Sequence, residues 1–86
     1  MSVYAVFLSE PNEKSWNDLK AKYPSRNFIL SENMAFVAPE DVTLTSDIME
    51  VVGVGKDTDQ LGIVFELDSY NGFHRGELWE WLGKFK

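Results

Sequence analysis

The sequence contains no cysteine and only one histidine, and both shortages narrow the chemistry open to it. Without cysteine there is no disulfide framework and no thiolate nucleophile. A lone histidine lacks the partners of a zinc site, so we expect neither a metal nor a cofactor. The apolar run at residues 3–8 is too short for a signal peptide or a membrane span. We therefore expect a cytoplasmic protein with no membrane partner.

Positive charge is scarce in the middle of the chain, although the formal net charge is only −6. Residues 32–68 contain nine acidic residues and a single base, Lys56, which gives −8, whereas residues 1–31 and 69–86 each have +1. Such a field repels phosphate backbones and attracts basic proteins, so we expect a protein partner with a basic surface rather than a nucleic acid. An acidic surface that only aids solubility is the simpler alternative. The acidic residues assigned to partner binding are Glu40, Asp41, Asp47, Glu50, Asp57, Asp59, Glu66 and Asp68.

The apolar residues fall in short segments typical of one small α+β domain spanning residues 1–86. Residues 3–8 are apolar on both alternating faces, which predicts a strand covered on both sides and central in a sheet. Residues 27–30 and 34–38 predict two strands of a hairpin. The alternation in residues 62–68 predicts a fourth strand. Its inward-facing residues would be Ile63, Phe65 and Leu67.

Two helices are expected between these strands. The first has Ser9 or Asn12 as its N-cap and ends before Pro24. The second precedes Gly53, which suits a helix end. Its candidate N-caps are Thr43, Thr45 and Ser46. The order β-α-β-β-α-β, followed by a further helix, predicts a ferredoxin-like split βαβ fold with an antiparallel sheet, its first and third strands central, and an additional C-terminal helix.

The C-terminal segment has an amphipathic pattern that predicts this last helix. Its apolar face consists of Leu78, Trp81, Leu82 and Phe85. The two earlier helices cover one side of the sheet, so Tyr4, Val6 and Leu8 need a cover if they point to the other side. Either the last helix folds across that face or a second copy of the chain does, which keeps a homodimer as an alternative.

The stretch that precedes the last helix forms an aromatic loop with a tight turn at Asn71-Gly72. Tyrosine, tryptophan and arginine are enriched at interface hot spots, which favours partner binding by this loop. The residues assigned to it are Tyr70, Asn71, Phe73, His74, Arg75 and Trp79. A small enzyme or ligand sensor with a pocket beside residues 69–75 is an alternative. Its working residues would be Tyr70, His74, Arg75 and Glu77.

The first and third predicted strands resemble the paired RNP segments of the RNA recognition motif. Val3-Tyr4 and Leu8 fit the shorter segment, and Ala35-Phe36-Val37 fits the middle of the longer one. The resemblance implies binding of single-stranded nucleic acid, with bases stacked on Tyr4 and Phe36. The charge of −8 over residues 32–68 favours the protein-binding hypothesis instead.

Phosphate-binding and nucleophile motifs are not matched. The GVGK stretch at residues 53–56 lacks the remaining glycine and hydroxyl positions of a P-loop, and no serine lies in a G-x-S-x-G turn. The sequence therefore favours a non-catalytic interaction or regulatory protein over an enzyme. In its sharpest form, the hypothesis is that the acidic surface masks a nucleic-acid-binding site on the basic partner.

Overall fold

The computed structural model of the chain describes residues 2–72, 74 and 76–85. Four strands and three helices follow one another along these residues. They are β1 (Tyr4–Leu8), α1 (Glu13–Lys22), β2 (Asn27–Ile29), β3 (Met34–Val37), α2 (Thr45–Val52), β4 (Gly62–Glu66) and α3 (Gly76–Phe85). Each element was expected from the sequence, and the ends differ from the prediction by one or two residues, within the usual uncertainty of such boundaries. No helix of the described residues is long and apolar enough to cross a membrane.

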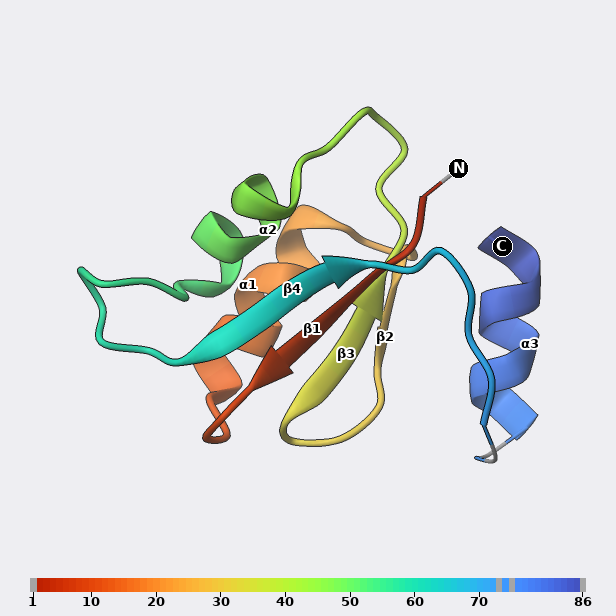
Figure 1. Cartoon of the computed structure of the whole chain (residues 1–86), viewed down its shortest axis with the longest axis horizontal. Coiled ribbons are helices and arrows are strands. Elements are labelled where there is room, and N and C mark those ends of the chain that lie inside the picture. Colours follow the sequence, from red (N-terminus) through yellow and green to blue (C-terminus); the bar gives the residue numbers. More distant parts are fainter. Residues whose placement is uncertain (1, 73, 75, 86) are drawn as a thin grey trace.

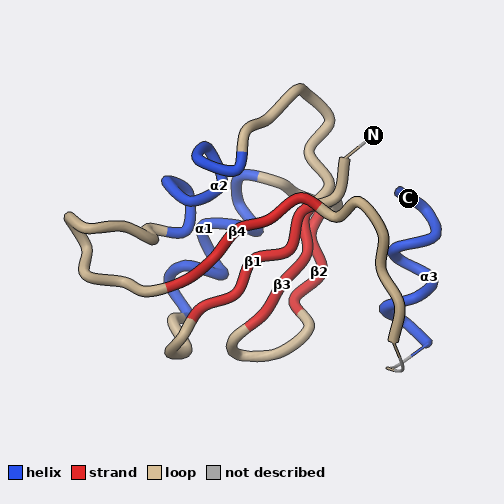
Figure 2. The backbone as a smooth tube through the Cα atoms, in the orientation of Figure 1, coloured by secondary structure: helices blue, strands red, loops and turns tan. Residues whose placement is uncertain are grey.

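The four strands form one antiparallel sheet in the order β2-β3-β1-β4 (Figure 2). The central position of the first and third strands is confirmed. The register places Val6 opposite Ala35 of β3 and Val64 of β4. Because residues directly opposite one another share a face, this register decides which side chains meet each helix layer.

The capping residues of α1 and α2 agree with the sequence prediction, with one exception at the start of α2. Asn12 is the N-cap of α1, and its Oδ1 accepts a hydrogen bond from the Ser15 backbone N–H at 3.2 Å. The expected N-caps of α2 are wrong, because Leu44 occupies that position. The Leu44 N–H donates to Asp47 Oδ2 at 2.9 Å, so the carboxylate supplies the capping bond in place of a hydroxyl. Gly53 ends α2 with a φ of 75°, as predicted.

One face of the sheet lies beneath α1 and α2 (Figure 1). The buried residues of this layer are Tyr4, Val6, Leu8, Trp16, Leu19, Ala35, Val37, Ile48 and Val52. Tyr4, Val6 and Leu8 therefore face the two helices, and the condition under which they would need a separate cover is not met. Since both alternating faces of β1 are apolar, the sequence pattern did not distinguish them.

The opposite face packs against α3, which confirms that the last helix covers part of the second side of the sheet. The buried residues of this layer are Val3, Ala5, Phe36, Ala38, Leu67, Leu78, Trp81 and Leu82. The Trp81 ring centroid lies 6.0 Å from that of Phe28 on β2 and 4.9 Å from that of Phe85. The fold thus has three layers, with the sheet between a helix pair and a single helix.

α3 leaves part of this second face uncovered, next to β4. Ile63 is 60% exposed, Phe65 is 43% exposed, and Phe7, which lies opposite Ile63 in the register, is 40% exposed. Of the three residues predicted to face inward on this strand, only Leu67 is buried. We call Phe7, Ile63 and Phe65 the bare sheet patch.

A polar network ties the segment before β4 to both inner helices. The Gln60 side chain accepts a hydrogen bond from Asn12 Nδ2 at 2.7 Å and donates to Ser15 Oγ at 3.0 Å and to the Val52 carbonyl at 2.8 Å. Ser15 Oγ also donates to the Val52 carbonyl at 2.6 Å. This network satisfies polar groups at the start of α1 and the end of α2 that would otherwise be buried without partners.

Candidate functional site

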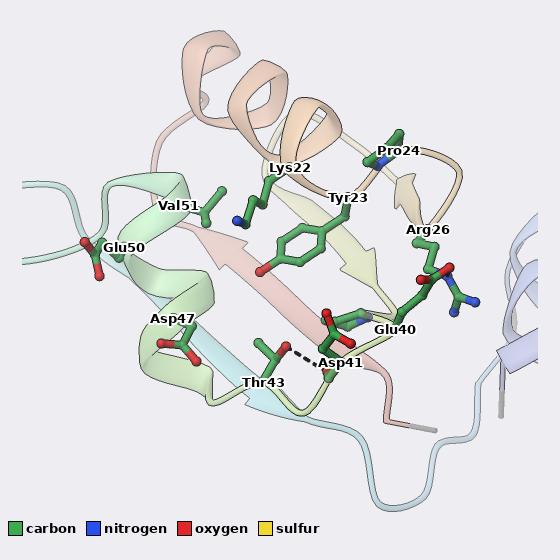
Figure 3. Close-up of a pocket in the computed structure, with 11 residues that line it drawn as sticks. Lys22, Tyr23, Pro24, Arg26, Glu40, Asp41, Thr43, Asp47, Glu50 and Val51 are labelled. Carbon is green, nitrogen blue, oxygen red and sulfur yellow. Dashed lines mark hydrogen bonds and ion pairs between the residues drawn. The ribbon is translucent and has the colours of Figure 1, made fainter.

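A cleft of about 810 Å³ opens between the end of α1, one side of α2 and the segment that joins β3 to α2 (Figure 3). Its lining residues are Lys22, Tyr23, Pro24, Arg26, Pro39, Glu40, Asp41, Thr43, Asp47, Glu50 and Val51. The Tyr23 ring lies in the middle of this cleft, while the acidic side chains come from α2 and the joining segment (Figure 3). We call this site the acidic cleft.

Four of the eight acidic residues predicted to bind a partner come together in the acidic cleft. They are Glu40, Asp41, Asp47 and Glu50, and all four are exposed. Lys22 and Arg26 are the cationic residues of the lining, so four carboxylates against two cations leave a formal charge of −2. The cleft therefore suits a cationic group better than an anion.

Arg26 is committed to contacts within the protein. Its Nε lies 3.4 Å from Glu40 Oε1, its Nη1 donates to the Ala38 carbonyl at 3.1 Å, and its guanidinium carbon lies 5.1 Å from the centre of the Phe85 ring. These contacts join the β2–β3 border of the cleft to α3. Glu40 faces Arg26, and Asp47 Oδ2 accepts the capping hydrogen bond from the Leu44 N–H, so Asp41 and Glu50 are the carboxylates more available to a ligand.

Tyr23 has an altered acidity within this cleft. Burial raises the pKa of the Tyr23 hydroxyl above its ordinary value of 10.0, and the negative charge of Asp47 and the Tyr4 phenol raise that pKa further. Tyr4 itself donates a hydrogen bond to the Thr43 carbonyl, which fixes the segment at the floor of the cleft. Tyr4 therefore helps to hold the β3–α2 segment against the sheet.

We expect the free energy of unfolding to fall as the pH rises above 10, because Tyr23 ionises in the unfolded chain before it ionises in the folded one. Its raised pKa means that the unfolded state binds fewer protons there, so stability decreases with pH until the folded pKa is passed. Urea unfolding of the wild type and of Tyr23→Phe, near neutral pH and above pH 10, measures this contribution. Tyr70→Phe removes a hydroxyl outside the cleft and is the control. An equal decrease in wild type and Tyr23→Phe would contradict the assignment.

The other four predicted acidic residues lie outside the acidic cleft. Asp57 and Asp59 are exposed in the turn that precedes β4, Glu66 is the last residue of β4, and Asp68 follows it. Glu66 Oε2 accepts a hydrogen bond from Ser2 Oγ at 2.9 Å. The structure thus divides the predicted acidic surface into one concave group and a set of dispersed exposed residues.

The aromatic loop contains a stacked pair of rings. The Tyr70 and Trp79 centroids lie 6.1 Å apart with an angle of 11° between the ring planes. Trp79 Nε1 donates to the His74 carbonyl at 3.2 Å, and Asn71 Oδ1 accepts from the Gly72 N–H at 2.9 Å. The predicted residues Phe73 and Arg75 lie outside the described residues.

A smaller hollow of about 270 Å³ lies between this loop, α3 and the second face of the sheet. Its lining is mainly apolar and includes Phe36, Phe65 and Trp79, with His74 at its border. Glu77, one of the working residues of the enzyme hypothesis, is not a lining residue. Of the described residues named by that hypothesis, Tyr70 and His74 line the hollow.

The pair of base-stacking residues suggested by the RNP resemblance is not formed. Tyr4 is buried beneath α1 and α2, whereas Phe36 is buried in the layer beneath α3. The two rings lie on opposite faces of the sheet, so a single nucleic-acid strand could not stack on both. The prediction for Tyr4 and Phe36 is wrong. In the observed register Phe36 lies opposite Ala5, so it shares a face with Ala5 and not with Tyr4.

The acidic cleft includes residues that the sequence did not indicate. Lys22 and Tyr23 were not assigned to any site, and Thr43 was only a candidate cap. Pro24 indicated only that the helix ends beside Tyr23 and gave no signal of which segment lies next to it. Within the described part of the chain, no group of three histidine or acidic side chains is placed to hold a metal ion.

Comparisons with known proteins give no match for this chain among protein-family models, curated proteins or solved structures.

Proposed function

We propose that this chain is a non-catalytic interaction protein that binds a basic segment of a protein partner in the acidic cleft. The single observation that carries the proposal is that Asp41 and Glu50, together with the capping residue Asp47, line one concave site. A lysine or arginine side chain entering the cleft would meet several carboxylates at once, which isolated surface charges do not offer.

The apolar part of the lining supports a side chain rather than a free ion as the ligand. Tyr23, Pro24 and Val51 line the same cleft as the carboxylates. Lysine and arginine have long aliphatic stems that pack on such surfaces while the charged end reaches polar groups. An arginine could also lie against the Tyr23 ring.

The sharper form of the proposal is regulatory. A basic protein surface that fits an acidic cleft is also the kind of surface that contacts phosphate groups. By occupying it, the chain would mask a nucleic-acid-binding site on its partner. An added oligonucleotide would then compete for the same surface and release the chain from the complex. Binding elsewhere on the partner would not be reversed in this way.

The fold that we propose for this module is the ferredoxin-like split βαβ arrangement. Support comes from the order β2-β3-β1-β4, in which α1 connects two strands that flank β3 and α2 connects two strands that flank β1. This arrangement brings the end of α1 beside α2, where the acidic cleft opens.

The test measures binding of a short labelled peptide rich in lysine and arginine by fluorescence anisotropy, at low and at physiological salt. We expect the double variant Asp41→Asn/Glu50→Gln to bind about three- to tenfold more weakly than the wild type. The matched control is Asp57→Asn/Asp59→Asn, which changes the net charge equally outside the cleft and should have a smaller effect. Equal weakening in both variants would mean that the peptide responds to the net charge of the chain and not to the acidic cleft. No binding at low salt would overturn the proposal.

A further inference from the structure

β4 forms one border of the sheet, because the strand order is β2-β3-β1-β4. Its inner side pairs with β1 over five residues, and no described strand pairs with its outer side. The other border, β2, has three half-buried residues and lies near α3. β4 is thus the longer and more accessible of the two edges, and an accessible edge is a template for a further strand.

The hydrogen-bond alternation shows which backbone groups of β4 are available. The Leu67 N–H donates to the Val3 carbonyl at 2.8 Å, so Leu67 and Val3 form a hydrogen-bonded pair next to the end of the ladder. In an antiparallel ladder such pairs alternate, so Ile63 and Phe65 direct their N–H and C=O groups towards β1. Val64 therefore directs its N–H and C=O outwards, away from the sheet.

The side chains at this edge do not protect it. Ile63 and Phe65 are 60% and 43% exposed on the same face of the sheet. The strand GIVFE contains neither the lysine nor the proline that commonly protects edge strands. An unpaired backbone and two exposed apolar side chains therefore lie together on one short strand.

We propose that two copies of the chain associate by pairing their β4 strands antiparallel, about a two-fold axis at Val64. In this register Val64 pairs with its own copy through outward-facing groups, as the alternation requires. Ile63 lies beside Phe65 of the second copy, and Phe65 beside its Ile63. The two sheets then form one continuous sheet of eight strands, with both copies of α3 on the same face.

The sequence of β4 is self-complementary in this register, which identifies the occupant as a second copy. All five residues of the strand are paired, and the apolar side chains meet apolar side chains. Glu66 lies opposite Gly62 of the second copy, so no two carboxylates face each other across the ladder. A shifted register that placed Glu66 opposite Glu66 of the second copy would pair fewer residues and bring two like charges together.

The dimer is expected to be weak and dependent on salt. A five-residue ladder and two exposed apolar pairs bury less than the roughly 800 Å² per partner of stable complexes. Each copy has a net charge of −6, so long-range repulsion opposes association. Added salt screens that repulsion and should therefore strengthen the dimer, whereas it weakens binding of a basic peptide to the acidic cleft.

The absence of cysteine allows a direct test of the register. In the proposed pairing, Ile63 and Phe65 of the second copy form a non-hydrogen-bonded pair with Cα atoms about 4.5 Å apart, within the range that a disulfide spans. Mixing Ile63→Cys with a size-tagged Phe65→Cys variant under mild oxidation should give mainly the mixed disulfide. Leu44→Cys, at a site that is 63% exposed outside the bare sheet patch, is the control. Mixed cross-linking no higher than with this control would overturn the proposal.

Sedimentation of the unmodified chain over a range of concentrations gives an independent measurement. We expect a monomer–dimer equilibrium that shifts towards dimer with salt, and loss of the dimer in Val64→Pro, which removes the outward N–H. Ile63→Lys is a second variant that keeps the strand backbone intact. The cleft variant Asp41→Asn/Glu50→Gln should still dimerise, which separates this proposal from the proposed function. A chain that stays monomeric at all concentrations would refute the pairing.

Discussion

Replacing Trp81 with alanine should lower the free energy of unfolding by about 3–5 kcal/mol, because it removes a large buried ring from the layer between α3 and the sheet. Trp81 is buried, and its ring contacts those of Phe28 on β2 and Phe85. The loss is comparable to the total stability of a small domain, which is about 5–15 kcal/mol. Urea unfolding followed by circular dichroism measures it.

Lys84→Ala is the matched control for this experiment, because Lys84 lies in the same helix with an exposed side chain. We expect that change to stay within about 0.5 kcal/mol of the wild type. A loss of less than about 1 kcal/mol for Trp81→Ala would mean that α3 contributes little to the fold, which contradicts the three-layer arrangement.

Gly62→Ala should be destabilising by about 1–3 kcal/mol, because the first residue of β4 has no space for a side chain. A Cβ atom there would lie 2.5 Å from the Phe7 carbonyl oxygen, 2.9 Å from Val54 Cγ2 and 3.1 Å from Leu8 Cδ2. The nearest of these atoms belongs to the backbone of β1, so the two strands would have to separate. The effect should appear as a lower midpoint in urea unfolding.

The same substitution in α3 provides a control with the opposite sign. A Cβ atom at Gly83 would meet no atom within 4 Å, and the residue lies inside the helix. Gly83→Ala should therefore stabilise the protein by about 0.5–1 kcal/mol, since glycine is a poor helix former. If Gly62→Ala were as stable as the wild type, the close approach of β4 to β1 described above would be wrong.

Much of the fold could be predicted from the sequence because the local patterns and the arrangement agree. The Asn12 cap and the Gly53 stop are local signals, and both hold in the structure. The exposed Asp47 shows the limit of such signals, since a carboxylate three residues into the helix supplied the cap for Leu44. Hydroxyl residues on either side of Leu44 were therefore misleading.

The assignment of faces was less accessible from the sequence. β1 is apolar in both alternating sets, so nothing in the strand itself indicates that Tyr4 meets α1 and α2 while Ala5 meets α3. Likewise, the alternation of Ile63, Phe65 and Leu67 is typical of a buried face, but of these three residues only Leu67 is buried in the layer with α3. How far a helix reaches across a sheet depends on tertiary packing and not on strand periodicity.

The acidic character of the candidate site could be predicted from the sequence, but the set of residues that line the cleft could not. The acidic segment was visible as a charge run, but its separation into a cleft and a dispersed group depends on which side chains α2 presents to α1. Tyr23 enters the cleft just after the end of α1, about twenty residues of chain before the acidic residues that line it. Contacts between distant segments of this kind have no local sequence signature.

Arg26 links the acidic cleft to α3, since one guanidinium contacts Glu40 on one side and the Phe85 ring on the other. Whatever shifts that guanidinium changes the free energy of both contacts. A ligand that drew the guanidinium away from Glu40 would therefore also change its contact with Phe85, and reciprocity requires the packing of Phe85 to change the affinity of that ligand by the same factor.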